Sequence, residues 1–283
     1  MEPDVVAGCS MGALVGGAFA AGWLDDLEEW AVTITRRDIV RFLDLDITNG
    51  GLIDGTRIMQ FLQGFKGDFL IEDLEKPYIA IASELYTGRE IWLRDGSIFS
   101  AIRASVSIPG FLRPFKRNGK WLLDGGLTNP VPVSACRALG ADFIIAVNPN
   151  ASNFSTLRLQ GVEKKRRSVQ GKNGDRDSYA VVLDRLLETV PEGVKCRIKS
   201  LTPDFLKSGA PDALGYGDVV STSIDIMTDQ IMRNRLAGDP PDIMLAPKVG
   251  HIGTLEFNRA EEAIAEGRRI VHQALPELKN LIG

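Results

Sequence analysis

The order of apolar and polar positions along the chain predicts strands alternating with helices, which is the pattern of an α/β fold. A short apolar run ends at Gly8, and from residue 11 a long segment of small and apolar residues follows. This is typical of a strand that passes at once into a helix packed closely on a sheet. Further short apolar runs predict strands at residues 78–82, 90–93 and 143–147.

Apolar residues at helical spacing predict several helices between and after these strands. Leu27, Trp30 and Ile34 share one face of a second helix, and Asp54 is placed to cap a third helix that carries Leu62. Three more segments are expected to be helical: residues 98–108, 218–236 and 258–275.

A hairpin is predicted where Asn118-Gly119 separates two strand-like segments, because this dipeptide is the strongest short hairpin signal. The second strand of the hairpin delivers Asp124, and Gly125-Gly126 follow directly, so that the backbone can come close to whatever the carboxylate faces. A helix through residues 130–139 and the apolar run at 143–147 then complete a strand-helix-strand unit. Its last strand is expected to be parallel and buried.

Composition and charge narrow the class of protein. The 283 residues are 44% hydrophobic and 25% charged, which is typical of one globular domain over 1–283. The net charge of −4 is spread along the chain and gives no footprint for nucleic acid. No apolar run is long enough to span a bilayer and no signal peptide is visible, so a cytoplasmic protein is expected.

The three cysteines, Cys9, Cys136 and Cys196, lack metal-ligand spacing, so neither a metal nor another cofactor is expected. Cys9 is interpreted as a core residue.

Residues 151–178 are polar and lack apolar periodicity, and they are interpreted as a mobile insertion within the domain. The segment includes Lys164-Lys165-Arg166-Arg167. A solvated loop is the preferred interpretation of this basic run, and peripheral contact with anionic lipid is the alternative.

The candidate chemistry lies at the first strand-helix junction, where Gly8-Cys9-Ser10-Met11-Gly12 has the G-x-S-x-G pattern of a nucleophile elbow. The two glycines are expected to be needed because a Cβ at either position would collide with the tight turn. Ser10 would then stand at a helix N-terminus, where the backbone N–H of Met11 can stabilise negative charge on a substrate oxygen.

A serine nucleophile needs a base, and the residues leave two kinds of candidate. His251, in a glycine-containing loop, would complete a Ser-Asp-His triad in the chain order of α/β-hydrolases, whereas His272 is expected to face solvent. Several strands precede the elbow in that fold, and almost nothing precedes Ser10 here. Asp124 on its glycine-flanked turn is the other candidate, and it would need partial desolvation to act as a base.

Four ordered motifs together resemble the bacterial patatin-like phospholipases: the elbow at residues 8–12, the glycine-rich stretch at 49–55, Ala104–Gly110, and Asp124-Gly125-Gly126 with the residues that follow to Pro132. The resemblance is close over about the first 150 residues. It implies a three-layer α/β/α fold with a central, mostly parallel sheet. It also implies hydrolysis of lipid acyl esters by a Ser-Asp dyad, with Ser10 as nucleophile and Asp124 as base.

The chain departs from this family at its start. Patatin-like proteins begin with a strand and a glycine-rich loop that supplies further oxyanion donors, whereas this chain begins after them. Losing such a donor typically costs about 10²- to 10³-fold in rate, so reduced hydrolysis is expected, together with an unpaired edge beside the nucleophile strand. The alternative function is a catalytically impaired binding or regulatory protein. A dinucleotide-binding fold is disfavoured because the early glycines do not form G-x-G-x-x-G.

Overall fold

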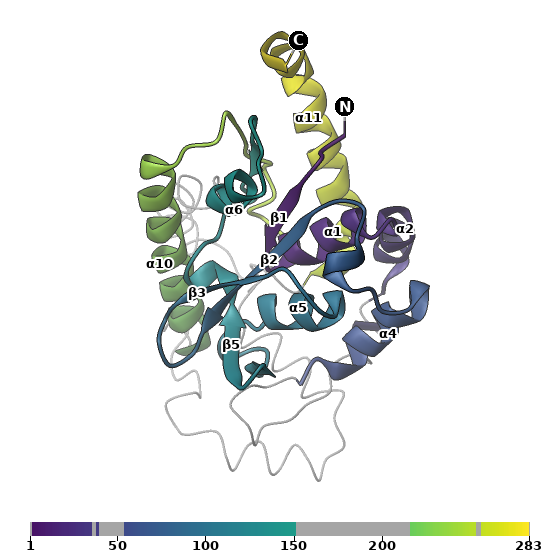
Figure 1. The fold of residues 1–283 in the computed structure, drawn as a ribbon, viewed down its shortest axis with the longest axis vertical. Coiled ribbons are helices and arrows are strands. Elements are labelled where there is room, and N and C mark those ends of the chain that lie inside the picture. Colours follow the sequence, from purple (N-terminus) through teal and green to yellow (C-terminus); the bar gives the residue numbers. More distant parts are fainter. Residues whose placement is uncertain (1, 36–37, 40–53, 151–215, 253–255, 283) are drawn as a thin grey trace, which may run out of the picture. The chain divides into compact units, whose positions relative to one another are not determined.

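The computed structural model describes residues 2–35, 38–39, 54–150, 216–252 and 256–282 (Figure 1). Contacts divide the chain into two compact units, one made of Met1–Phe154 with Thr228–Gly283 and the other of Ser155–Met227. The sheets and the candidate site belong to the first unit. The expectation of one domain over 1–283 stays a prediction, and the polar segment 151–178 lies outside the described residues.

A five-stranded sheet lies at the centre of the first unit: β1 and β5 pair with β2 along one edge, β3 pairs with the other edge of β2, and β4 pairs with β5. A second, two-stranded sheet contains β6 and β7. The strands are β1 Val6–Cys9, β2 Tyr78–Glu84, β3 Glu90–Leu93, β4 Phe115–Arg117, β5 Lys120–Asp124, β6 Ile145–Val147 and β7 Ile243–Leu245.

The α/β fold is confirmed, and its central sheet is mixed. β1 and β2 are parallel, whereas the β2–β3, β2–β5 and β4–β5 pairs are antiparallel. Among the described strands β1 pairs only with β2, so the expected unpaired edge beside the nucleophile strand is present. The predicted hairpin is confirmed as well, because Asn118 and Gly119 form its turn with φ angles of 49° and 78°.

The described helices follow the periodic segments of the sequence. They are α1 Met11–Ala20, α2 Leu24–Thr33, α4 Thr56–Lys66, α5 Ile98–Ser105, α6 Val133–Ala138, α10 Tyr216–Gly238 and α11 Ala260–Ile282, with 3₁₀ turns at Ile71–Asp73, Gly125–Leu127 and Phe257–Arg259. The predicted cap of α4 is wrong: Gly55, in the left-handed region with φ 76°, occupies the N-cap, and the Asp54 carboxylate instead accepts from Thr56 and Arg113.

Side chains on the two faces of β2 show how the helices form layers. Tyr78, Ala80 and Ala82 belong to the main core with α1, α2 and α5. Ile79 and Ile81 point to the opposite face, where they pack with residues of α6. The central sheet is therefore covered by helices on both faces, as the three-layer expectation required (Figure 1).

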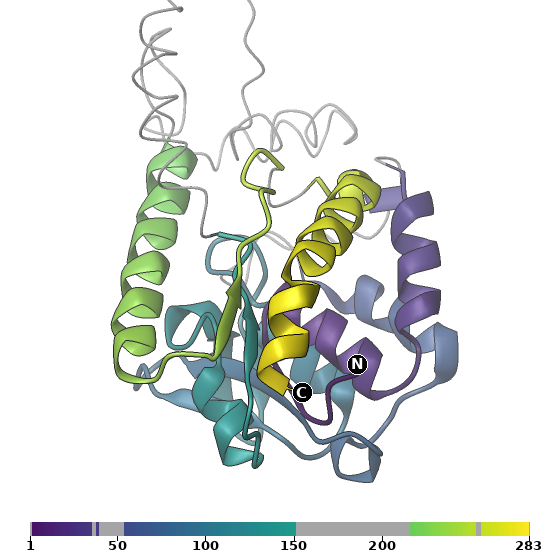
Figure 2. The same ribbon diagram turned by 90° about the horizontal axis from the view of Figure 1, so that it is seen from above.

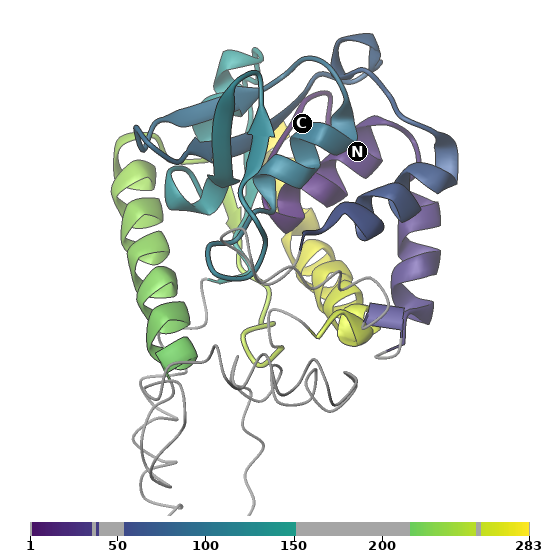
Figure 3. The same ribbon diagram turned by 90° about the horizontal axis from the view of Figure 1, so that it is seen from below.

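The remaining helices of the first unit extend these layers. Figure 3 shows α4 next to α5, on the side of the main core. Figure 2 shows α11 beside α2, where Arg268 pairs with Glu28, and Leu278 of α11 packs on Ile243 and Leu245 of β7. None of the described helices has the length and apolar character needed to cross a bilayer.

The strand predicted at 143–147 differs from expectation in two ways. It is parallel, as predicted, but its partner is β7 and not a strand of the central sheet, so it does not close the expected strand-helix-strand unit there. It is also buried on one face only, because Ala146 is buried whereas Ile145 and Val147 are exposed. An unbroken apolar run indicates a strand, but it does not tell which strand lies beside it.

Candidate active site

Ser10 lies at the junction of β1 and α1 in a conformation that few residues other than glycine adopt, with φ 54° and ψ −122°. Its carbonyl oxygen accepts from the N–H of Ala13 at 2.9 Å, which starts the helix. Backbone strain of this kind persists only where the surrounding structure holds it, and it is frequent at functional sites. β1 therefore passes directly into α1 through a strained turn at Ser10, as the motif predicted.

The two glycines of the motif have different surroundings. A Cβ on Gly8 would lie 2.1 Å from the carbonyl oxygen of Gly12, so the turn can close only on a bare α-carbon. A Cβ on Gly12 would meet no atom within 4 Å. The expectation that both glycines prevent a collision is thus confirmed for Gly8 and wrong for Gly12, whose Cβ direction points away from the turn.

Asp124 ends β5 opposite Ala82 of β2 and is almost fully buried. Its Oδ1 atom accepts from the N–H of Gly126 at 2.7 Å and from the Cys9 thiol at 3.7 Å. Its Oδ2 atom is also buried but has no hydrogen-bond partner among the described residues. A buried carboxylate oxygen without a partner is costly and calls for an explanation.

Burial raises the pKa of Asp124 from 3.8 to about 6, because a charged carboxylate is less stable away from water. Hydrogen bonding by the Ser10 hydroxyl, the Gly126 amide and the Cys9 thiol opposes this increase. Ser10 is therefore among the groups that affect the Asp124 pKa, while Oδ2 accepts no hydrogen bond from a described residue. The structure thus brings Ser10 and Asp124 together.

The sheet register explains this proximity. Cys9, the residue before Ser10, pairs with Ile81 of β2, and Asp124 pairs with the next residue of β2, Ala82. β1 and β5 therefore meet end to end along one edge of β2, opposite the edge to which β3 is paired. Gly125 makes the close approach possible, because a Cβ there would lie 2.2 Å from the carbonyl oxygen of Ile81.

Cys9 has two kinds of neighbour. It packs on the small core cluster of Ile79 and Ile81, as its interpretation as a core residue required, and its sulfur also touches Asp124. Burial, followed by the neighbouring Asp124 charge, raises the pKa of Cys9 well above its ordinary value, so the side chain remains a thiol that can donate to the carboxylate.

Two side chains that the sequence did not single out support the Asp124 backbone. The hydroxyl of Ser83 donates to the carbonyl oxygen of Asp124 at 2.9 Å and lies 2.8 Å from the hydroxyl of Thr128. Ser83 is a polar residue at the end of an apolar strand, and this was the available signal. Its partner could not be deduced, because the contact spans 41 positions of sequence.

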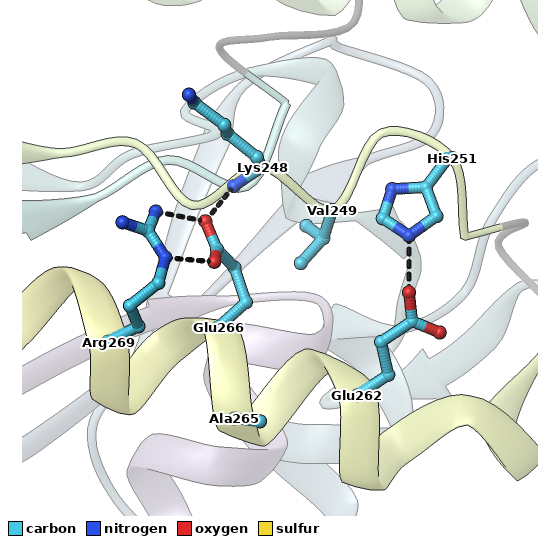
Figure 4. A pocket seen from close by; sticks show the side chains of 7 residues that line it. All are labelled: Lys248, Val249, His251, Glu262, Ala265, Glu266 and Arg269. Atoms are coloured by element: carbon cyan, nitrogen blue, oxygen red, sulfur yellow. Dashed lines mark hydrogen bonds and ion pairs between the residues drawn. The ribbon is translucent and has the colours of Figure 1, made fainter.

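The structure places His251 at a different site. Its Nε2 atom lies 2.5 Å from Glu262 Oε1 on α11, and it lines a small surface pocket of about 270 Å³ with Lys248, Glu266 and Arg269 (Figure 4). Groups that line this pocket bind one another: the Arg269 guanidinium and the backbone N–H of Lys248 both donate to the Glu266 carboxylate. The Ser-Asp-His alternative is therefore not supported.

His272 is exposed on α11, as expected. Within the described residues no group of three or more His, Cys, Asp or Glu side chains has the arrangement of a metal site. The Met11 amide lies at the first position of α1, where an N–H has no partner within the helix, and its role as oxyanion donor stays a prediction.

Comparison with known proteins agrees with this geometry. The family model described as patatin-like phospholipase matches residues 1–137. An uncharacterized NTE family protein of Mycobacterium tuberculosis is 33% identical over 296 residues, which cover 95% of this chain and 82% of that relative. The class that the fold and these similarities indicate is that of lipid hydrolases. The chain belongs to the patatin-like phospholipase family.

More distant relatives extend the similarity. A second uncharacterized NTE family protein of Mycobacterium tuberculosis is 27% identical over 282 residues, covering 99% of this chain and 42% of the relative. The rat patatin-like phospholipase domain-containing protein 7 is 28% identical over 172 residues, covering 56% of this chain and 12% of its own length. Membership in a phospholipase family implies lipid substrates.

Proposed function

We propose that the protein hydrolyses acyl esters of lipids through an acyl-enzyme on Ser10, with Asp124 as the base. The observation that carries the proposal is the asymmetric environment of the Asp124 carboxylate. Gly126 and Cys9 hold Oδ1, whereas Oδ2 is buried without a partner among the described residues, and the strained Ser10 directly follows Cys9. One oxygen is fixed and the other is left to take a proton from Ser10.

In the first half of the reaction the Ser10 hydroxyl oxygen attacks the ester carbonyl carbon while Asp124 accepts the hydroxyl proton. The backbone N–H of Met11 donates to the oxyanion that forms. Collapse of this intermediate breaks the bond to the alcohol, which leaves with the proton from Asp124. Water then attacks the acyl group, gives its proton to Asp124, and Ser10 is released when that proton returns.

The shifted pKa of Asp124 suits this role. An ordinary aspartate is a weak base near neutral pH, and desolvation that raises the pKa to about 6 makes the carboxylate a better proton acceptor while it remains mostly ionised at pH 7. No histidine is needed for this step, and the described histidine with a carboxylate partner, His251, binds Glu262.

The surface next to the nucleophile supports a lipid acyl group as substrate. Met11 and Val15 are large apolar side chains that are about half exposed, and they lie one turn apart on α1 directly after Ser10. An exposed apolar strip beside a nucleophile is suited to contact an acyl chain.

The direct test is labelling by a fluorophosphonate probe, followed by mass spectrometry of the modified peptide. Labelling is expected at Ser10 and should be lost in Ser10→Ala and strongly reduced in Asp124→Asn. The matched control is Asp229→Asn, because Asp229 is equally buried and also has an oxygen without a partner, but it binds Arg233 on α10. Equal labelling of Ser10→Ala and the unmodified protein would exclude the proposal.

The pH dependence gives a second test of the base. The labelling rate should rise with pH through a midpoint near 6, since only the ionised Asp124 can accept the proton. A folded protein that neither labels at Ser10 nor turns over a short-chain nitrophenyl ester at any pH would instead favour the non-catalytic alternative.

A further inference from the structure

The chain segment at the end of α5 contacts both members of the proposed dyad. Ser105 is the last residue of α5 and Ser107 follows two positions later, and both are fully buried. Their hydrogen bonds connect α5 to the elbow on one side and to the Asp124 strand on the other.

Ser105 binds the nucleophile through its side chain. Its hydroxyl accepts the backbone N–H of Ser10 at 2.9 Å and donates to the carbonyl oxygen of Ile81 at 2.6 Å. Strand pairing of β1 with β2 ends at Cys9, so the Ser10 amide lies beyond the paired residues. The Ser105 hydroxyl therefore satisfies a backbone donor at the point where the chain adopts its strained conformation.

Ser107 binds the base through its backbone. Its carbonyl oxygen accepts the N–H of Asp124 at 2.9 Å. The Ser107 hydroxyl donates to the carbonyl oxygen of Arg103 at 2.9 Å and accepts from the Arg103 guanidinium at 2.8 Å. The segment is thus anchored to the last turn of α5 and cannot shift independently of it.

We propose that Ser105 is a positioning residue of the active site, which holds the Ser10 elbow at a fixed place relative to Asp124. This inference rests on the proposed function, because it concerns the same nucleophile and base. One segment, Ser105–Ser107, binds the backbone of both residues, so the position of the Ser10 hydroxyl relative to the Asp124 carboxylate depends on the Ser105 bond. Without that bond the partly buried Ser10 amide loses its acceptor and the elbow can relax.

Replacement of Ser105 by alanine is the principal test. The turnover number for a nitrophenyl ester should fall by about 10-fold or more with KM within about twofold, because misplacement of a reacting group affects the chemical step more than binding. Tyr78→Phe is the matched control: the buried Tyr78 hydroxyl donates to the Ala13 carbonyl oxygen at 2.7 Å, so this variant also loses one buried hydrogen bond but leaves the Ser10 amide paired. Its turnover number should stay within about twofold.

Two further variants separate loss of the hydroxyl from a change of volume. Ser105→Thr keeps the hydroxyl and should retain most of the turnover. Ser105→Cys keeps a side chain of the same branching, with a larger sulfur atom that is only a weak acceptor. It should behave like Ser105→Ala, and it provides the measurement if the alanine variant does not fold. Full turnover in folded Ser105→Ala or Ser105→Cys would overturn the proposal.

Hydrogen exchange of the Ser10 amide provides a readout that does not depend on catalysis. Exchange should be slow in the unmodified protein and in Tyr78→Phe, and at least 10-fold faster in Ser105→Ala, because only the last lacks the acceptor. Unchanged exchange in Ser105→Ala would overturn the positioning role whatever the activity. Normal protection of Ser10 in a protein that does not label at Ser10 would instead count against the proposed function alone.

Discussion

Gly125 and Ile81 approach each other so closely that a Cβ atom on residue 125 would not fit between them. A Cβ on Gly125 would lie 2.2 Å from the carbonyl oxygen of Ile81 and 2.7 Å from its carbonyl carbon. Ile81 belongs to β2, whose backbone is fixed by pairing to β1 and β3. The turn after Asp124 can therefore lie against β2 only because residue 125 is glycine.

Gly125→Ala should accordingly move this turn and displace Asp124. We expect a destabilisation of roughly 2–4 kcal/mol and a large loss of Ser10 labelling, because neither the backbone at residue 125 nor that of β2 can shift without a large energetic cost. Urea unfolding and fluorophosphonate labelling measure the two effects. Gly238→Ala is the matched control, because a Cβ there meets nothing within 4 Å and φ is not in the left-handed region. Equal stability of the two variants would contradict the argument.

The two glycines of the elbow motif should respond differently to substitution. Gly8→Ala forces a Cβ to within 2.1 Å of the Gly12 carbonyl oxygen, so we expect a loss of roughly 2–4 kcal/mol. Gly12→Ala adds a Cβ in open space within α1 and should leave stability unchanged or raise it by up to about 1 kcal/mol, because alanine favours the helix. Denaturant unfolding of both variants checks this, and similar losses would refute it.

These glycines show what the sequence could and could not reveal. The pattern of strand, glycine, serine and small-residue helix was enough to predict the elbow, because its signals are adjacent in the chain. The pattern treats Gly8 and Gly12 alike, whereas only the three-dimensional direction of each missing Cβ determines which one is crowded. Asn118-Gly119 was predictable for the same local reason, since the turn depends on these two residues.

Contacts between distant segments were not predictable in this way. The pairing of β6 with β7 joins residues about 100 positions apart, and the apolar run at 143–147 carries no information on its partner. Ser105 contacts the Ser10 amide across 95 positions, and serine at a helix end is equally compatible with capping. The residues made Asp124 one of two candidate bases for Ser10, the family resemblance favoured it, and the sheet register brings the two strand ends together.

Substitution of His251 distinguishes a dyad from a triad. We expect His251→Ala to label at Ser10 at a rate within about twofold of the unmodified protein, because its ring binds Glu262 on α11 and not Asp124. His272→Ala, at an exposed position of the same helix, is the control for general effects on α11. A 100-fold loss confined to His251→Ala, with the fold retained, would restore the triad.

Asp124→Asn should reveal how much stability the buried carboxylate costs. Because burial raises the pKa of Asp124 from 3.8 to about 6 in the folded protein, the folded state binds more protons than the unfolded state between these values. The ionisation of Asp124 therefore lowers the stability of the unmodified protein by about 3 kcal/mol as pH rises from about 4 to 6. Asp124→Asn shows no such loss, because asparagine does not ionise. The stability difference between the variant and the unmodified protein should grow in favour of Asp124→Asn over this range and stay constant above it. Urea unfolding at several pH values measures this difference, in which other titrating groups cancel. A difference independent of pH from 4 to 7 would show that Asp124 is not desolvated as the structure implies.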